Sequence, residues 1–278
     1  MTSLPAGYLE RYGPWAVVTG ASDGIGRAFA QELAAAGFSV VLVARRDAEL
    51  RSLADELTRA FGTRSRVIVT DLADPQAAAA MLEQTTDLDV GLLIAAAGFG
   101  SSGPILSQSA SSEFDQVMVN CQAVLGQCIH FGRRLETRRR GGVVLLSSVV
   151  AFHGTPWSAN YAATKAYVQS LAEALQQEWA PLGIQVLASA PGPVGTGFGV
   201  RAQMTMGRAL SASVVARQSL LALPRGGTVR PGWLSKLLGW SLATAPRAVR
   251  VRIMGSVMHG LSSHPSGAPR PATGGRAV

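Results

Sequence analysis

The chain has few cysteines, few lysines and no long apolar run. Cys121 and Cys128 are its only cysteines, and they lie seven positions apart on a predicted helix, too far for a disulfide between them. Neither has a metal-ligand companion at a useful spacing. We therefore expect two reduced thiols in a cytoplasmic protein, and no metal site. No apolar run reaches the roughly 18 residues that a transmembrane helix needs, and residues 1–13 lack the apolar core of a secretory signal.

Acidic residues are missing from the last part of the chain. Residues 1–200 contain 14 basic and 17 acidic side chains, whereas residues 201–278 contain 11 basic side chains and no acidic one. Arginines that solvate helix faces would explain this imbalance. A basic C-terminal surface that weakly contacts a membrane or an acyl carrier is the alternative, and it would make the protein peripheral to a membrane. No nucleic-acid-binding motif accompanies the charge, so we expect no nucleic-acid partner.

Short apolar runs alternate with helical patterns through the first 190 residues. The predicted strands are Trp15–Thr19, Ser39–Ala44, Ser65–Val69, Gly91–Ala96, Gly142–Ser147 and Gln185–Ala190. The predicted helices are Gly26–Ala36, Ala48–Phe61, Pro75–Thr85, Ser111–Glu136 and Ala159–Ala180. Apolar runs without alternation indicate strands that are buried on both faces. Their alternation with helices predicts an α/β fold built from right-handed βαβ units around a parallel sheet.

The pattern changes beyond Pro191. We expect a glycine-rich loop in PGPVGTGFGV, a helix over 207–223, a turn cluster in PRGGTVRPG and one or two helices over 233–262. PGWLSKLLGWSL places tryptophans and leucines beside basic residues, which favours a buried or lid segment; a dimer surface or a membrane-surface helix are the alternatives. Residues 1–263 are predicted to form one domain with a substrate-pocket part from about 197, and 264–278 a flexible tail.

A glycine-rich turn follows the first predicted strand. The motif TGASDGIG spans residues 19–26, with glycines at 20, 24 and 26, and it opens the next helix. Glycine lets a backbone approach a pyrophosphate closely, and the helix N-terminus adds amide donors and a positive dipole. We interpret this segment as the pyrophosphate-binding turn of a dinucleotide site. A tight strand–helix turn without a ligand is the alternative interpretation.

The second predicted strand ends in arginine instead of a carboxylate. An acidic residue about 20 residues past the turn would bind a ribose 2′-hydroxyl, but Arg45 and Arg46 stand there. Because arginine can hold a 2′-phosphate, we predict NADPH or NADP⁺ in preference to NAD(H). Arginines that face solvent are the alternative. Asp71 and Leu72 end the third strand and could line an adenine pocket; a helix N-cap role for Asp71 or Asp74 is equally compatible with the sequence.

Tyr161 and Lys165 lie four residues apart in YAATK, on a predicted helix. Residues at this spacing share one helix face, and an ammonium beside a phenol lowers the phenol's pKa. A tyrosine of this kind can exchange a proton with a carbonyl or an alcohol. The pair could also be ordinary helix-surface residues. However, the chain has two lysines against 23 arginines, so a lysine here indicates a site that needs a compact ammonium. Ser148 precedes Tyr161 by thirteen residues.

In this order and spacing, the motifs resemble the short-chain dehydrogenase/reductase family over roughly 16–196. The resemblance rests on TGASDGIG, the AAAG after the fourth strand, Asn120, Ser148, YAATK and PGPVGT. It implies a doubly wound Rossmann sheet of about seven parallel strands with helices on both faces. It also implies NAD(P)-dependent oxidation of alcohols or reduction of carbonyls, and a homodimer or homotetramer. One departure is that Ala95 and Ala96 stand where the family has two asparagines that brace the sheet.

The resemblance assigns roles by position. Tyr161 would be the catalytic acid in reduction and the base in oxidation, and Lys165 would bind the nicotinamide ribose and lower the Tyr161 pKa. Ser148, rather than the strand-end Ser147, would orient the substrate oxygen. Asn120 would hold a water in the proton relay. The predicted cofactor-binding residues are Gly20, Ser22, Asp23, Gly24, Ile25, Gly26, Arg45, Arg46, Asp71, Leu72, Ala97, Gly98, Tyr161, Lys165, Pro191, Gly192, Val194 and Thr196.

Apolar segments are predicted to line the substrate pocket. They are Phe99–Ile105, Val149–Trp157 and residues 198 to about 222. This composition favours a hydrophobic substrate, and the resemblance extends to steroids and long-chain acyl compounds. His153 could contact the substrate or face water. We therefore expect an NADPH-dependent reductase of an apolar ketone or aldehyde, or a dehydrogenase that oxidises the corresponding alcohol. A non-catalytic NADPH-binding regulator is the alternative.

Overall fold

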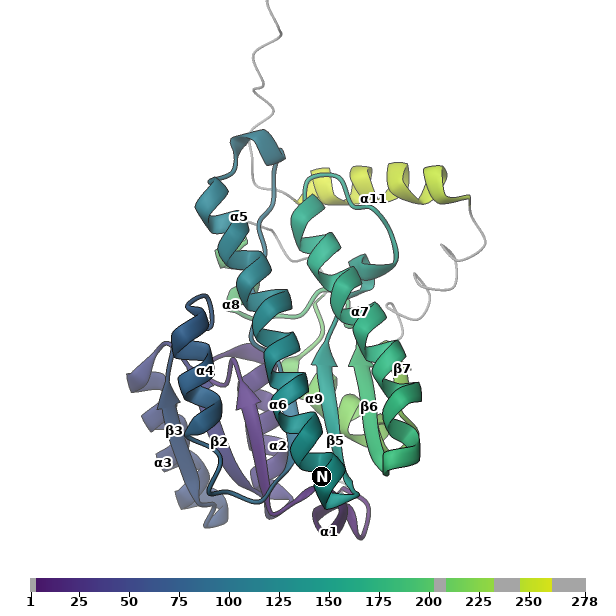
Figure 1. The fold of residues 1–278 in the computed structure, drawn as a ribbon. Coiled ribbons are helices and arrows are strands. Elements are labelled where there is room, and N and C mark those ends of the chain that lie inside the picture. Colours follow the sequence, from purple (N-terminus) through teal and green to yellow (C-terminus); the bar gives the residue numbers. More distant parts are fainter. Residues whose placement is uncertain (1–3, 203–208, 233–245, 262–278) are drawn as a thin grey trace, which may run out of the picture.

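Seven parallel strands form the central sheet (Figure 1). The computed structural model describes residues 4–202, 209–232 and 246–261. Its strands are β1 Trp15–Thr19, β2 Ser39–Ala44, β3 Ser65–Val69, β4 Val90–Ala95, β5 Gly141–Leu146, β6 Ile184–Ser189 and β7 Gly227–Val229. They lie in the order β3-β2-β1-β4-β5-β6-β7, and every neighbouring pair is parallel. The predicted doubly wound parallel sheet of about seven strands is confirmed.

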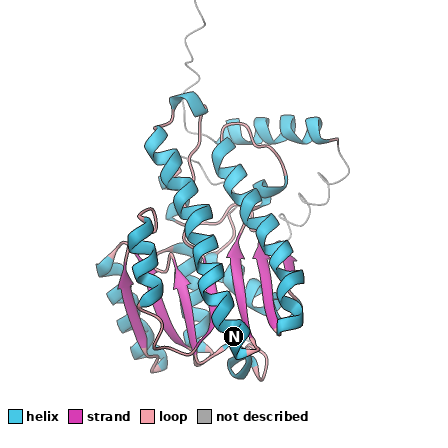
Figure 2. Ribbon diagram, in the orientation of Figure 1, coloured by secondary structure: helices cyan, strands magenta, loops and turns pink. Residues whose placement is uncertain are grey.

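Helices cover both faces of this sheet (Figure 2). They are α1 Tyr8–Tyr12, α2 Gly24–Ala35, α3 Asp47–Phe61, α4 Pro75–Glu83, α5 Ala110–Val117, α6 Ala123–Arg138, α7 Ala159–Trp179, α8 Gly197–Arg201, α9 Ala212–Ala222 and α11 Arg247–Leu261. α2, α3 and α9 bury side chains such as Leu33 and Leu220 in one core layer. α4, α6 and α7 bury side chains such as Met81 and Val168 in the other. The sheet is therefore shielded from water on both sides.

The strands in the middle of the sheet are apolar at successive positions, as burial on both faces requires. Val41 and Leu42 on β2 are both fully buried, although successive side chains of a strand point to opposite faces. They belong to different core layers, one on each side of the sheet. An unbroken apolar run is therefore favourable at every position of this strand.

The direction of the strand order changes at β1, which pairs with β2 on one side and β4 on the other. In open α/β sheets, ligands bind outside the carboxyl ends of the strands at such a switch point. Figure 1 shows α11 and the ends of α5 and α7 on this side of the sheet. The fold therefore places the residues that follow β1, β4, β5 and β6 around one opening.

Two predictions for the part beyond residue 190 are wrong. The predicted turn cluster in PRGGTVRPG contains β7, which pairs with β6, and the predicted glycine-rich loop contains α8. β7 has three residues, and both its first residue, Gly227, and the preceding Gly226 have positive φ. Its strand conformation comes from the ladder with β6, where the Ala190 amide also donates to the Val229 carbonyl at 2.8 Å. Pairing of this kind is invisible in local composition.

The long predicted helix over 111–136 is interrupted. α5 and α6 are joined by a π-helical turn, Met118–Gln122. Such turns insert an extra residue and are frequent at functional sites. The turn buries Asn120, whose side chain is 1% exposed. The short helix α1 was not predicted. Gly37 and Gly183 follow helical segments and have positive φ, as is typical of glycines that end helices.

Some predictions concern residues outside the described part of the chain. The segment PGWLSKLLGWSL lies outside it beyond residue 232, as does the predicted tail 264–278. α11 lies within the range predicted for the last helices. Among the described residues, no helix has the length and apolar character that crossing a membrane requires.

Thr19, at the end of β1, links the switch point to β4. Its hydroxyl accepts a hydrogen bond from the Ala97 amide at 3.2 Å and donates one to the Ile94 carbonyl at 3.5 Å. Thr19 is fully buried. This side chain therefore braces the backbone beside Ala95 and Ala96, where the usual pair of asparagines is missing.

We predict that Thr19→Val lowers the free energy of unfolding by about 1–3 kcal/mol, because it leaves the buried Ala97 amide without its partner. Urea unfolding followed by circular dichroism measures this change. Thr137→Val is the matched control, since the Thr137 hydroxyl donates to the Arg133 carbonyl on an exposed part of α6; it should change stability by less than about 0.5 kcal/mol. Equal losses in the two variants would contradict a bracing role for Thr19.

Candidate active site

One cavity of about 710 Å³ opens at the carboxyl ends of the strands. It extends from the glycine-rich turn after β1, past the ends of β4, β5 and β6, to α11. Every predicted cofactor residue lines this cavity, as do Ser148, Tyr161 and Lys165. Asn120 is the exception among the predicted site residues, because it lies behind the cavity wall.

The glycine-rich turn leaves no room for side chains. A Cβ added to Gly20 would lie 2.9 Å from the Ala97 backbone, and one added to Gly24 would lie 2.8 Å from the Thr196 side chain. Both glycines have positive φ. A Cβ on Gly26 would overlap the Gly20 carbonyl. The turn and the start of α2 can therefore pack this closely against the ends of β4 and β6 only if these positions are glycine.

The N-terminus of α2 keeps its amide groups available. Asp23 occupies the N-cap position, but its carboxylate makes no capping hydrogen bond. Instead, it pairs with Arg201 of α8 at 3.1 Å. Free amides at a helix N-terminus, together with the helix dipole, favour a bound anion. The turn thus fits the pyrophosphate of a dinucleotide, in agreement with the prediction for this motif.

Two arginines lie beyond the turn at the end of β2. Arg46 contacts the Ser22 hydroxyl through its Nε at 3.3 Å and its Nη2 at 3.1 Å. Arg45 lies 3.5 Å from the Asp71 carboxylate. Both guanidinium groups are exposed and line the cavity. They can therefore reach an anionic group beside the ribose end of a bound dinucleotide without a large desolvation cost.

The sequence allowed a helix N-cap role for either Asp71 or Asp74, and the structure distinguishes between these two residues. Asp74 caps α4, since its carboxylate accepts from the amides of Gln76 at 2.8 Å and Ala77 at 3.3 Å. Asp71 instead accepts from the Ala73 amide at 3.0 Å and lines the cavity with Leu72. Contact of Asp71 and Leu72 with an adenine ring stays a prediction.

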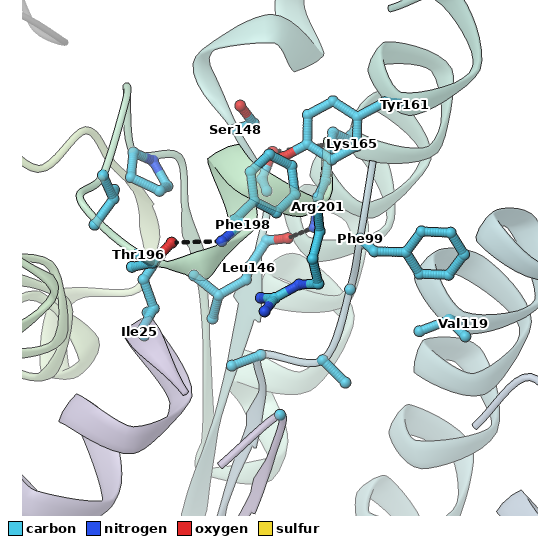
Figure 3. Close-up of a pocket in the computed structure, with 18 of the residues that line it drawn as sticks. Ile25, Phe99, Val119, Leu146, Ser148, Tyr161, Lys165, Thr196, Phe198 and Arg201 are labelled. Carbon is cyan, nitrogen blue, oxygen red and sulfur yellow. Dashed lines mark hydrogen bonds between the residues drawn. The ribbon is translucent and has the colours of Figure 1, made fainter. Parts of the chain in front are cut away.

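The central part of the cavity brings Ser148, Tyr161 and Lys165 together (Figure 3). Ser148 follows β5, and both Ser148 and Tyr161 line this part of the cavity. The Lys165 Nζ donates to the Leu146 carbonyl at 2.6 Å and lies 5.7 Å from the centre of the Tyr161 ring. Phe198 of α8 covers this ring, with the two ring centres 5.4 Å apart. The predicted catalytic set is therefore assembled at one place.

The pKa values differ from the prediction for Tyr161. Burial raises the pKa of Tyr161 to about 12, and the Ser148 side chain partly opposes this shift. The predicted lowering by Lys165 is not found, because the ammonium is bonded to the Leu146 carbonyl beside the ring instead of to the phenol oxygen. Burial also lowers the pKa of Lys165, to about 8. At neutral pH, Tyr161 is therefore a neutral phenol and Lys165 is still mainly an ammonium.

Asn120 supports the site from behind. Its amide nitrogen donates to the Phe99 carbonyl at 2.9 Å and to the Thr164 hydroxyl at 3.0 Å, and its oxygen accepts from the Phe99 amide at 3.2 Å. A Cβ on Gly98 would lie 3.0 Å from that oxygen and 3.4 Å from the Lys165 Nζ. The Asn120 side chain thus fixes the end of β4 against α7. A water held by this residue stays a prediction.

Ser147 and His153 are also placed by the structure. The Ser147 hydroxyl donates to the backbone carbonyl of Lys165 at 3.3 Å, so it joins β5 to α7 as a structural serine. His153 is half-buried and lines the cavity, which favours substrate contact over the open-water alternative.

Several residues of the cavity were not predicted. They lie on α5, in the π-helical turn, after β7 and on α11: Ser112, Asp115, Val119, Arg230, Ile253, Met254, Val257, Met258 and Leu261. The buried cavity residues of α11 recur at helical spacing. Positions 254 and 258 are buried, whereas positions 252 and 256 are exposed. This periodicity was readable in the sequence. The position of α11 above Tyr161, where Met254 packs, was not.

Known proteins resemble this chain in sequence and in fold. A family model described as short chain dehydrogenase matches residues 14–206. A 7beta-hydroxysteroid dehydrogenase from Collinsella aerofaciens is 34% identical over 179 residues, which span 64% of this chain and 67% of that protein. A very-long-chain 3-oxoacyl-CoA reductase from Aspergillus terreus is 37% identical over 191 residues, 66% of this chain. The matched part spans only 54% of that relative.

Solved structures agree with these matches. A structure from work on 7beta-hydroxysteroid dehydrogenase stereoselectivity has a TM-score of 0.83 and 27% identity, and the match covers 89% of this chain and 98% of that one. A short-chain dehydrogenase from Sphingobium yanoikuyae in complex with NADPH has a TM-score of 0.76 and 27% identity, covering 85% and 98% of the two chains.

We predict a pH-dependent effect of Lys165→Met on stability. The folded protein binds the Lys165 proton less tightly, with a pKa of about 8 against an ordinary value of 10.5. The unfolded chain thus holds more protons between these pH values, so the stability of the wild type rises with pH in this window. Lys165→Met lacks this rise. The difference in free energy of unfolding, variant minus wild type, should therefore become more negative by up to about 3 kcal/mol from pH 8 to 10.5. Urea titrations at several pH values measure this fall, and a constant difference would contradict it.

Proposed function

The chain belongs to the short-chain dehydrogenase family, and we propose that it uses NADPH to reduce the carbonyl of an apolar ketone or aldehyde, or oxidises the corresponding alcohol. Members of this family are oxidoreductases that act on CH–OH groups. The observation that carries the proposal is the placement of Ser148 and Tyr161 beside the buried Lys165 ammonium. This group lies in a cavity with a phosphate cradle at one end and an apolar wall at the other.

The chemistry follows from the protonation states. Tyr161 is protonated at neutral pH, because its pKa is raised to about 12. It can therefore donate its proton to a substrate oxygen that lies between its phenol and the Ser148 hydroxyl. Bound NADPH would supply the hydride that reduces the substrate carbon. As Tyr161 loses its proton, the nearby Lys165 ammonium stabilises the phenolate that forms. In the oxidative direction the same phenolate would act as the base.

The preference for NADPH is supported by Arg45 and Arg46. Arginines stand at positions 45 and 46, where a carboxylate would bind a ribose 2′-hydroxyl. Arg45 pairs with Asp71 and Arg46 with Glu49, but both guanidinium groups remain exposed at the cavity edge. Guanidinium groups bind phosphate through paired, charge-assisted hydrogen bonds. The NADPH complex of the Sphingobium relative is consistent with this preference.

The substrate class is supported by the wall beyond Tyr161. Val149, Val150 and Phe152 line it from one side, and Ile253 and Val257 of α11 from the other. Such a wall suits a large apolar molecule. The named relatives act on hydroxysteroids and on very-long-chain 3-oxoacyl-CoA, and we propose a steroid or a long-chain acyl compound here. Homo-oligomer formation and the contact of the basic C-terminal part with a membrane or carrier stay predictions.

The regulator alternative rested on the Ala95–Ala96 departure. The Thr19 hydroxyl provides hydrogen bonds to the backbone in that region, so the departure gives no reason to expect a loss of cofactor binding. The assembled Ser148, Tyr161 and Lys165 favour an enzyme.

We predict that Tyr161→Phe reduces kcat by about 10²- to 10⁴-fold, because it removes the proton donor. NADPH consumption, followed by absorbance against a panel of steroid, aliphatic and aromatic ketones, measures the change. Tyr167→Phe is the matched control, since Tyr167 is 39% exposed on the same helix and should keep full activity. Turnover by Tyr161→Phe at the wild-type rate would refute the assigned role, and binding of NADPH without any turnover by wild type would favour the regulator.

For the cofactor, we predict that the double substitution Arg45→Gln and Arg46→Gln raises KM for NADPH by about 10- to 100-fold and leaves KM for NADH nearly unchanged. The reason is that both guanidinium groups would lose contact with the 2′-phosphate only. Arg51→Gln is the control, because Arg51 pairs with Asp47 on the exposed side of α3. Equal effects on NADPH and NADH would exclude recognition of the 2′-phosphate by these arginines.

A further inference from the structure

Three basic side chains gather at the end of the cavity that is distant from the glycine-rich turn. Arg230 follows β7 and lines the cavity, as does His153, which follows the turn after Ser148. Arg250 of α11 lies close by. Burial lowers the pKa of His153, and the positive charges of Arg250 and Arg230 lower it further. The cavity therefore ends in a positively charged region instead of an entirely apolar one.

Arg230 is held in place without a carboxylate. Its guanidinium carbon lies 4.3 Å from the centre of the Phe152 ring, and its Nε is buried without a hydrogen-bond partner. No ion pair found among the described residues includes Arg230. Residues 201–278 contain no Asp or Glu at all, so no acidic side chain beyond residue 200 can neutralise it. A partly buried guanidinium is unfavourable unless an anion pairs with it.

The phosphates of a dinucleotide are too far away to be this anion. The pyrophosphate turn follows β1 and the two arginines Arg45 and Arg46 follow β2, whereas Arg230 follows β7. In the order β3-β2-β1-β4-β5-β6-β7, four strand spacings separate β1 from β7 and five separate β2 from β7. At about 4.8 Å per spacing, these are distances of about 19 and 24 Å. Arg230 therefore belongs to the substrate end.

The surroundings of Arg230 indicate what kind of anion fits. Phe152 stacks on the guanidinium, and Val150 packs with Met254 of α11 beside Tyr161. A ligand that reaches from Tyr161 to Arg230 thus passes an apolar wall and ends at a cationic group. A fully charged, strongly hydrated molecule would not suit the wall, and a neutral hydrocarbon would leave the guanidinium unpaired.

We propose that Arg230, with His153 beside it, binds a carboxylate on the substrate, so that the substrate is an amphipathic acid with its ketone at Tyr161 and its anionic group at the β7 end. This inference rests on the proposed function for the identity of the substrate. The binding subsite itself can be tested without turnover.

The test uses a keto-steroid with a side-chain carboxylic acid and its methyl ester as matched probes. Calorimetric titration of the full chain with each probe measures binding, and NADPH-coupled kinetics measure KM and kcat. Wild type should bind the acid about 10- to 100-fold more tightly than the ester. Arg230→Gln should remove this preference by raising Kd and KM for the acid to those of the ester, with kcat within about threefold, and Arg230→Lys should restore part of it.

Arg252→Gln is the matched control, because it removes the same charge from an exposed position of α11 outside the cavity; it should keep the preference for the acid. Unchanged NADPH binding and circular dichroism would show that Arg230→Gln is folded. Equal affinity of wild type for acid and ester, or an equal loss for both probes in Arg230→Gln, would overturn the subsite. Tight binding of the acid without reduction would leave the subsite standing and would count against the proposed reductase.

Discussion

The buried ammonium of Lys165 is the constraint on which the rest of the site depends. Lys165 is 6% exposed, and no carboxylate among the described residues forms an ion pair with it. Removing an ammonium from water is costly unless it is hydrogen-bonded, and the Leu146 carbonyl at the end of β5 supplies the bond at 2.6 Å. Ser147 binds the Lys165 backbone from the same strand end. These contacts fix α7 against β5, and they place Tyr161, one turn earlier, beside Ser148.

Around this fixed centre, the sheet divides the cavity by charge and polarity. The strands on one side of the switch point carry the glycine turn and two exposed arginines, a combination that suits a phosphorylated dinucleotide. The strands on the other side carry the apolar turn after Ser148, β7 and the face of α11. The ion pair between Asp23 and Arg201 joins the two sides across the opening. Cofactor and substrate would therefore meet at Tyr161 because the strand order brings both ends to it.

The parts of the fold that could be predicted from the sequence are those with a strong local pattern. The six longer strands were placed to within one residue. The signal was strongest for β2, β4 and β5, which are apolar runs buried on both faces. The glycine turn and YAATK were found because their chemistry depends on closely spaced residues. β7, α8 and the π-helical turn at Asn120 were missed, because pairing and packing with distant segments determine them.

Arg230 could not be recognised from the sequence, since its significance comes from its contact with Phe152 and from the absence of an acidic neighbour in space. The Tyr161 pKa was predicted in the wrong direction because burial cannot be read from residue spacing.

The most direct test of the account is the fate of the hydride. The wild-type chain should be incubated with the best ketone substrate and NADPH that carries deuterium at both nicotinamide C4 positions, and the alcohol product analysed by mass spectrometry and NMR. The account predicts one deuterium on the carbinol carbon of a single stereoisomer, since the ketone oxygen is held between Ser148 and Tyr161 in one orientation. An alcohol without deuterium at that carbon, or no alcohol while NADPH remains bound, would contradict hydride transfer at this site.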